Sequence, residues 1–179
     1  MKYTLSTCIS VLMICTIPFL TRAAVVDSSA NGFTVKIELL VNVSTDSLYT
    51  YLVRDVGKWW DPEHTYSDNA SNLSIQPVIN GCFCENLGNG GFVRHMTVVY
   101  VNPGQILRLE GGLGPLQELA VTGSMTFMII PDALKTKLSF HYTVGGYFPG
   151  GASAWATMVD KVLGEQLKRL KDFAEKRKK

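Results

Sequence analysis

The chain has 179 residues, with 17 Lys and Arg against 15 Asp and Glu and a formal net charge of +2 at pH 7. This small charge gives no electrostatic reason to expect nucleic acid as a partner. The length fits one domain with a substantial core, because no linker, internal repeat or low-complexity stretch divides the sequence. Hydrolase, kinase and dehydrogenase activities lack their usual motifs.

The N-terminal segment predicts export. Lys2 precedes an apolar run of about sixteen residues, 5–20, and small residues flank a cleavage site before Ala24. We expect residues 1–23 to be a secretory signal peptide and residues 24–179 to be the mature domain, exported to the periplasm or secreted. An uncleaved membrane anchor is the alternative, but a span needs about 20 apolar residues.

Turn residues and alternation predict a body made mostly of strands, with helices near its start. Residues 33–43 alternate and are rich in β-branched side chains, which indicates a first strand. Ser44 is the predicted N-cap of a helix. Gly57 marks a break and Asp61-Pro62 ends the helical run, giving two short helices after the first strand. Six further strands are predicted at residues 73–78, 82–87, 92–101, 106–110, 119–130 and 135–144.

A long amphipathic helix follows the glycine-rich segment 145–151, with Ser153 as its predicted N-cap. Its apolar residues recur at helical spacing and form one stripe. They are Trp155, Met158, Val159, Val162, Leu163, Leu167, Leu170, Phe173 and Ala174. Such a stripe needs a large apolar surface, so we predict an α+β fold in which a curved antiparallel sheet of about seven strands wraps around this helix.

The end of this helix is basic. Residues 168–179 contain seven Lys or Arg against Asp172 and Glu175, a local charge of +5. Such a segment fits a solvated helix end, where cations face the negative pole of the helix dipole. The alternative is weak contact with an anionic membrane surface.

The cysteines and histidines do not predict a metal site. After signal cleavage only Cys82 and Cys84 remain, and on a strand they share a face at about 6–7 Å, near the limit for a disulfide. We therefore expect no bridge between them, which leaves free thiols packed against other side chains or an intermolecular bridge in an oxidising compartment as alternatives. His141 is expected to be exposed, and His64 lies in a polar loop without a partner that its spacing suggests. No metal and no cofactor is expected.

Four motifs resemble one superfamily. They are Gly57-Lys58-Trp59-Trp60-Asp61-Pro62, Gly81-Cys82-Phe83-Cys84-Glu85, residues 95–104 (HMTVVYVNPG) and residues 121–127 (VTGSMTF). Together with the order of elements, they resemble the START-like helix-grip superfamily, also called SRPBCC, in its branch of polyketide cyclase and heat-shock ATPase-activator homologues. The resemblance covers residues 33–175. It implies a deep cavity between sheet and C-terminal helix, which members use to carry lipids, bind hormones, cyclise polyketides or dock protein partners.

Aromatic and large apolar residues are the candidates to line such a cavity. Trp59 and Trp60 are adjacent at a helix end and must point in different directions. Either Trp59 joins the core stripe and Trp60 caps a loop, or one of them lines the cavity mouth. The loops 111–116 and 145–151 are either plain turns or an apolar gate at the entrance. The candidate ligand-binding residues are Trp59, Trp60, Phe83, Leu113, Leu116, Phe127, Tyr142, Tyr147, Phe148 and Trp155.

Glu85 and His95 are the candidate catalytic residues. Alternation does not show which face of their strands is interior. If both side chains point inward, they form a general acid and base pair. If Glu85 points outward near Arg94, it forms an ordinary cross-strand ion pair, and this second arrangement is the one we expect.

The favoured hypothesis is an exported, monomeric, non-enzymatic protein that binds a small hydrophobic molecule between sheet and helix. The first alternative is a cyclase or dehydratase acting on a hydrophobic, polyketide-like substrate, which requires Glu85 and His95 to meet at the cavity. The second is an interaction protein resembling the heat-shock ATPase activators. The predicted signal peptide disfavours it, because the partner of those proteins is cytosolic.

Overall fold

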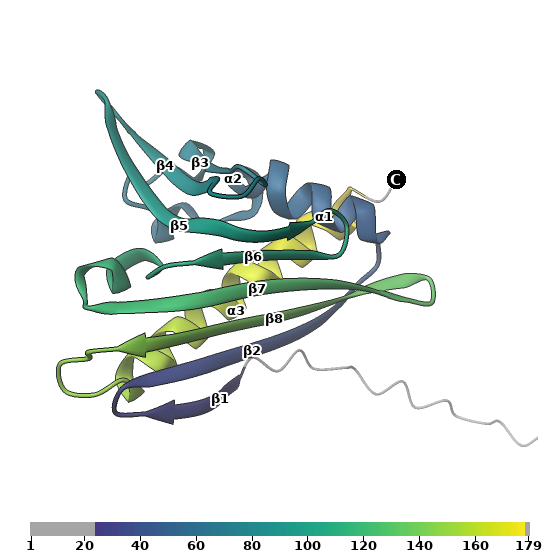
Figure 1. Cartoon of the computed structure of the whole chain (residues 1–179). Coiled ribbons are helices and arrows are strands. Elements are labelled where there is room, and N and C mark those ends of the chain that lie inside the picture. Colours follow the sequence, from purple (N-terminus) through teal and green to yellow (C-terminus); the bar gives the residue numbers. More distant parts are fainter. Residues whose placement is uncertain (1–23, 178–179) are drawn as a thin grey trace, which may run out of the picture.

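The computed structural model describes residues 24–177 and consists of an antiparallel sheet crossed on one face by a long C-terminal helix (Figure 1). The eight strands lie in the order β1-β2-β8-β7-β6-β5-β4-β3. Their bounds are β1 Ala24–Ser29, β2 Gly32–Val41, β3 Leu73–Ile75, β4 Cys82–Gly88, β5 Gly91–Asn102, β6 Ile106–Glu110, β7 Val121–Asp132 and β8 Lys135–Gly146. The helices are α1 Thr45–Arg54, α2 Val56–Trp59 and α3 Ser153–Lys176. The predicted signal segment, 1–23, lies outside the described residues.

The predicted α+β architecture is confirmed, with eight strands among the described residues where about seven were expected. The unpredicted strand is β1, an edge strand that pairs only with β2. Most of its residues are exposed, so it lacks the alternation that marks a half-buried strand. The strand predicted at residues 73–78 is β3 and ends at Ile75, and β7 continues to Asp132, beyond the predicted end at residue 130.

The core lies between α3 and the sheet face that it covers. Alternate residues of β2, including Val35, Ile37 and Leu39, are buried, and Leu138 and Phe140 of β8 lie beside them. From α3, this core receives Ala156, Leu163, Leu167, Leu170 and Ala174. The predicted helical stripe is therefore a packing face along most of its length. The residue before α3 is Ala152, which has no side-chain cap, so the prediction of Ser153 as N-cap was wrong.

The two short helices form as predicted, but their junction differs from the expectation. Ser44 caps α1 by accepting a hydrogen bond from the backbone N–H of Ser47. The break falls at Asp55, whereas Gly57 lies inside α2. A Cβ at Gly57 would stand 2.8 Å from the carbonyl oxygen of Ala70, so this glycine permits close packing and does not end a helix.

Cys82 and Cys84 form a disulfide, which corrects the expectation of no bridge. Their Cα atoms are 5.3 Å apart, closer than two positions on a regular strand. The ladder is irregular at this point: Phe83 pairs with Met96 and Cys84 with Arg94, so β5 carries an extra residue opposite the pair. The disulfide therefore lies where the pairing of β4 and β5 departs from regular strand geometry.

Ion pairs compensate part of the basic charge near the C-terminus. Lys168 pairs with Asp172 at 2.7 Å, Lys171 pairs with Glu175, and Arg169 lies 3.3 Å from Asp61. Within residues 24–177, we find no helix that is both long enough and apolar enough to span a bilayer.

Candidate functional site

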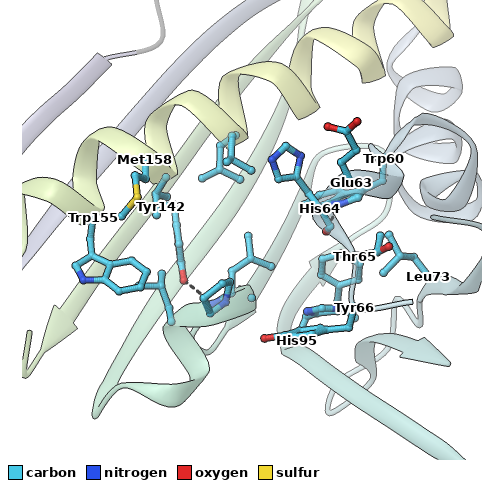
Figure 2. A pocket seen from close by; sticks show the side chains of 18 residues that line it. Trp60, Glu63, His64, Thr65, Tyr66, Leu73, His95, Tyr142, Trp155 and Met158 are labelled. Carbon is cyan, nitrogen blue, oxygen red and sulfur yellow. Dashed lines mark hydrogen bonds between the residues drawn. The ribbon is translucent and has the colours of Figure 1, made fainter. Parts of the chain in front are cut away.

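A cavity of about 330 Å³ opens between α3, the sheet and the segment that follows α2 (Figure 2). Its wall is mostly apolar, and it combines residues from seven parts of the chain. They are Trp60, Glu63, His64, Thr65, Tyr66, Leu73, Phe83, His95, Leu113, Gly114, Pro115, Leu116, Tyr142, Trp155, Met158, Val159, Val162 and Leu163. Its volume and composition are those of a pocket for a small organic molecule.

Six of the ten candidate ligand-binding residues line this cavity: Trp60, Phe83, Leu113, Leu116, Tyr142 and Trp155. Four lie elsewhere. Trp59 is 2% exposed in the core, where its indole N–H donates to the carbonyl of Tyr51. Phe127 packs in the core against Phe140, its cross-strand neighbour on β8, and Phe148 packs against Phe33. Tyr147 is 68% exposed. Of the two expected gate loops, only residues 111–116 contribute to the described wall. Of the two adjacent tryptophans, Trp59 lies in the core and Trp60 lines the cavity.

Sequence reasoning missed the cavity residues contributed by two segments. One is the polar stretch after α2, which includes the 3-10 turn η1, Pro62–His64, and continues through Tyr66. Its polar residues gave no pattern that distinguishes a cavity roof from a loop. The other is the N-terminal half of α3, where Met158, Val159 and Val162 were expected to pack on the sheet. These residues face the cavity, so the apolar stripe combines packing residues with cavity residues.

The bulge in β5 decides where His95 points. His95 is the extra residue, and both His95 and the adjacent Met96 are buried, at 6% and 1% exposed. Strict alternation would place these two side chains on opposite faces. Bulges commonly redirect one side chain in this way, and no sequence pattern predicts the bulge in β5.

Glu85 and His95 meet inside the protein, which corrects the expectation that Glu85 pairs outward with Arg94. Glu85 is fully buried, and its Oε2 lies 3.0 Å from His95 Nε2. Glu85 also accepts backbone N–H bonds from Tyr66 at 3.1 Å and Ser67 at 2.6 Å. The carboxylate therefore ties β4 to the segment after η1 and holds the imidazole at the cavity wall.

The pKa values of Glu85 and His95 both lie below their ordinary values, for opposite reasons. Burial raises the pKa of Glu85, but hydrogen bonds from Ser67, from the Tyr66 backbone and from His95 outweigh it, so the pKa lies below its ordinary value. Burial lowers the pKa of His95, and the attraction of Glu85 reverses this only in part. The arrangement favours an ionised Glu85 beside a neutral His95.

Both shifts predict that acid destabilises the fold. Because His95 binds its proton less readily in the folded state, stability falls as pH drops below the unfolded value of about 6.5, and Glu85 adds a loss below about 4.3. The His95→Phe variant should show a flatter stability profile just below about pH 6.5, by at most about 1.4 kcal/mol per pH unit. Urea denaturation at several pH values measures this. The control is His141→Phe, which changes a half-buried side chain on β8. Equal slopes for wild type and His95→Phe would contradict the prediction.

No family model matches the chain, and no curated protein matches it. Solved structures do. The chain is similar to MLL2253 from Mesorhizobium loti, with a TM-score of 0.60 and 16% identity over 82% of this chain and 99% of that one. It is also similar to DynU16, a protein of the dynemicin biosynthetic locus, with a TM-score of 0.56 and 18% identity over 79% of this chain and 47% of that one. A third similar structure is the Aha1 dimer from Colwellia psychrerythraea, with a TM-score of 0.56 and 16% identity over 82% and 98%.

The chain has the START-like helix-grip fold. The helix-grip architecture that the resemblance implied is thereby confirmed. Identities of 16–18% carry the fold alone, so the activity has to be argued from the cavity of this chain.

In this helix-grip fold, Gln166 fastens the segment after α2 to α3. The side chain is fully buried; its Oε1 accepts the backbone N–H of Asp61 at 2.8 Å, and its Nε2 lies 3.1 Å from His64 Nδ1. Arg169 of the same helix donates to the carbonyl of Trp59 at 2.9 Å. His64, which spacing left without a partner, therefore has one on a helix 102 residues away.

Tyr142 fixes the opposite rim of the helix-grip cavity. Its hydroxyl donates to the carbonyl of Gly111 at 3.1 Å and accepts the backbone N–H of Leu113 at 3.0 Å. Burial raises the pKa of Tyr142 to about 12, so the hydroxyl stays protonated. Across residues 24–177, no three His, Cys, Asp or Glu side chains gather in a group that could hold a metal ion.

Proposed function

We propose that the protein is a monomeric binding protein for a small, largely apolar molecule held in the cavity between sheet and α3. The observation that carries the proposal is the wall itself: about 330 Å³ enclosed mostly by aromatic and aliphatic side chains. An apolar molecule entering it leaves water and gains roughly 25 cal/mol for each Å² of apolar surface that it buries.

Native mass spectrometry of the mature protein, purified gently from its host, tests the proposal. A retained apolar molecule, identified after denaturing extraction, supports it and gives the ligand class. Titration with the fluorescent apolar probe N-phenyl-1-naphthylamine extends the test to protein that has lost its ligand. A clean protein mass together with no binding of this probe contradicts it.

Filling the cavity should abolish binding of the probe. Val162 is half-buried on the cavity side of α3, so Val162→Trp places an indole in the volume that a ligand would occupy. We expect affinity for N-phenyl-1-naphthylamine to fall by about a hundredfold or more, with little loss of stability. The matched control is Glu165→Trp, which adds the same ring on the exposed side of the helix. Equal binding by both variants would place the probe outside the cavity.

Proton transfer is a second candidate function, supported by the meeting of Glu85 and His95 at the cavity wall. A neutral His95 can take a proton from a carbon between two carbonyl groups, leaving an enolate, while the Glu85 carboxylate stabilises the imidazolium. This is the step that a cyclase or dehydratase acting on a polyketide-like substrate requires. The test is exchange of the central protons of benzoylacetone in D₂O, followed by NMR. Acceleration that disappears in His95→Phe supports catalysis, and no acceleration contradicts it.

Export is also proposed, with residues 1–23 as a cleaved signal peptide. The Cys82–Cys84 disulfide supports it, because such bonds persist mainly in oxidising compartments. The intact mass of the protein recovered outside the cytosol tests it. A mass that matches a chain beginning at Ala24, less the two hydrogens lost when the disulfide forms, supports the proposal. An intact N-terminus with free thiols contradicts it.

A further inference from the structure

The hydrogen-bond network fixes which nitrogen of His95 carries the proton. Glu85 Oε2 lies 3.0 Å from His95 Nε2, and a carboxylate that already takes two backbone N–H bonds acts as an acceptor. His95 Nε2 must therefore donate. Since a neutral imidazole has a single N–H, Nδ1 keeps a lone pair and is a hydrogen-bond acceptor.

His95 Nδ1 lacks a donor. The side chain is 6% exposed, and within residues 24–177 no hydrogen-bond partner reaches this atom. The ring forms part of the cavity wall, stacked with Tyr66 at an interplanar angle of 16° and 5.1 Å from the ring of Phe83. A buried acceptor without a donor is unfavourable, and a ligand that supplies an N–H or O–H removes this cost.

A second polar group of the cavity has the opposite character. The Asp61 N–H donates to Gln166 Oε1, which fixes the orientation of the amide, so Gln166 Nε2 donates to His64 Nδ1. His64 in its neutral form then carries its own proton on Nε2 and offers a donor. The two histidines that line the cavity therefore supply one unpaired acceptor and one donor, a pair that a hydroxyl group can match because it both donates and accepts.

The charges at the cavity disfavour anions. Its described wall contains Glu63 and no Lys or Arg, and the Glu85 carboxylate stands directly behind His95. Glu63, His64, Tyr66 and His95 lie on one side, while Trp155, Met158 and Tyr142 lie across the cavity (Figure 2), and the Tyr142 hydroxyl is already engaged by Gly111 and Leu113. A fatty acid or other carboxylate would bring a negative charge towards two carboxylates with no cation to balance it.

From this arrangement we infer that the ligand is a neutral molecule with an apolar body and one hydroxyl or phenol group, whose O–H donates a hydrogen bond to His95 Nδ1. The inference rests on the proposed function, since it names the ligand class of the same cavity. The apolar body lies against the Trp155 side and the hydroxyl against the histidines. Recognition by a buried, unpaired acceptor discriminates strongly against analogues that lack the donor.

Three probes with the same skeleton test the inference near neutral pH: 2-naphthol, 2-methylnaphthalene and the anion 2-naphthoate, each in competition with N-phenyl-1-naphthylamine. We expect 2-naphthol to bind about tenfold more tightly than the other two. His95→Phe should remove this preference while keeping the affinity for 2-methylnaphthalene, and His141→Phe should leave the preference intact.

A spectroscopic readout makes the test independent of any variant that fails to fold. Addition of 2-naphthol to the wild-type protein should shift the ¹⁵N resonance of His95 Nδ1 towards that of a hydrogen-bonded nitrogen, whereas 2-methylnaphthalene should not. Equal affinities for the three probes, tighter binding of 2-naphthoate, or an unmoved Nδ1 resonance in the 2-naphthol complex would overturn the hydroxyl inference while the cavity still binds. Failure of all probes, N-phenyl-1-naphthylamine included, in protein whose intact mass shows no retained molecule overturns the proposed function and the inference with it.

Discussion

Replacing Glu85 with Ala should lower the free energy of unfolding by about 3–5 kcal/mol. The side chain is fully buried and receives donors from Tyr66, Ser67 and His95. Its removal leaves these three donors without an acceptor, and each unpaired buried donor costs about 1–3 kcal/mol. Equilibrium denaturation in urea gives the change directly.

The matched control for this prediction is Glu38→Ala. Glu38 pairs with Lys36 at 3.2 Å and Lys137 at 3.1 Å, but its side chain is 43% exposed, so the loss should be about 0–1 kcal/mol. Similar losses in the two variants would mean that the Glu85 network does not hold the segment after α2. If Glu85 holds this segment in place, the effect of its removal should be strongest there. Amide hydrogen exchange of Tyr66 and Ser67 should then accelerate in Glu85→Ala more than amide exchange in β8 does.

Much of the fold could be predicted because the relevant patterns are local. The N-cap at Ser44 and the strand ends on either side of residues 88–91 depend on neighbouring residues, and the stripe of α3 repeats at helical spacing. β1 was not predicted because an exposed edge strand has no buried face to impose alternation. The disulfide between Cys82 and Cys84 was not predicted because regular strand geometry was assumed where β5 carries a bulge.

The site was harder to predict because its geometry depends on contacts between distant segments. Glu85 and His95 were recognised as a possible pair, but the direction of His95 depends on the bulge, which follows from the pairing of two strands and not from either strand alone. The contact of His64 with Gln166 joins positions 102 residues apart. Candidate aromatic residues such as Phe127 and Phe148 failed to reach the cavity because aromatic character does not separate core packing from ligand contact.

The tryptophans of the cavity should separate stability from binding. Trp60 is 7% exposed, packs against Trp59 and Phe83, and donates from its indole nitrogen to the carbonyl of His64 at 3.0 Å. Trp60→Ala should therefore cost about 3–5 kcal/mol of unfolding free energy. Trp155 is only half-buried at the other side of the cavity. Trp155→Ala should cost about 1 kcal/mol or less and weaken binding of N-phenyl-1-naphthylamine about tenfold.

The reason for this difference is where each ring finds its contacts. The neighbours of Trp60 are protein side chains whether or not a ligand is present, so its removal leaves a void in the folded state. Trp155 borders the empty volume, and much of the contact surface that it can offer is available only to an occupant. The test is to measure the free energy of unfolding and the affinity for N-phenyl-1-naphthylamine in both variants. If Trp155→Ala loses stability without losing affinity, the ring is part of the packing of α3, and the apolar end of the ligand site has to be sought around Val159 and Leu163 instead.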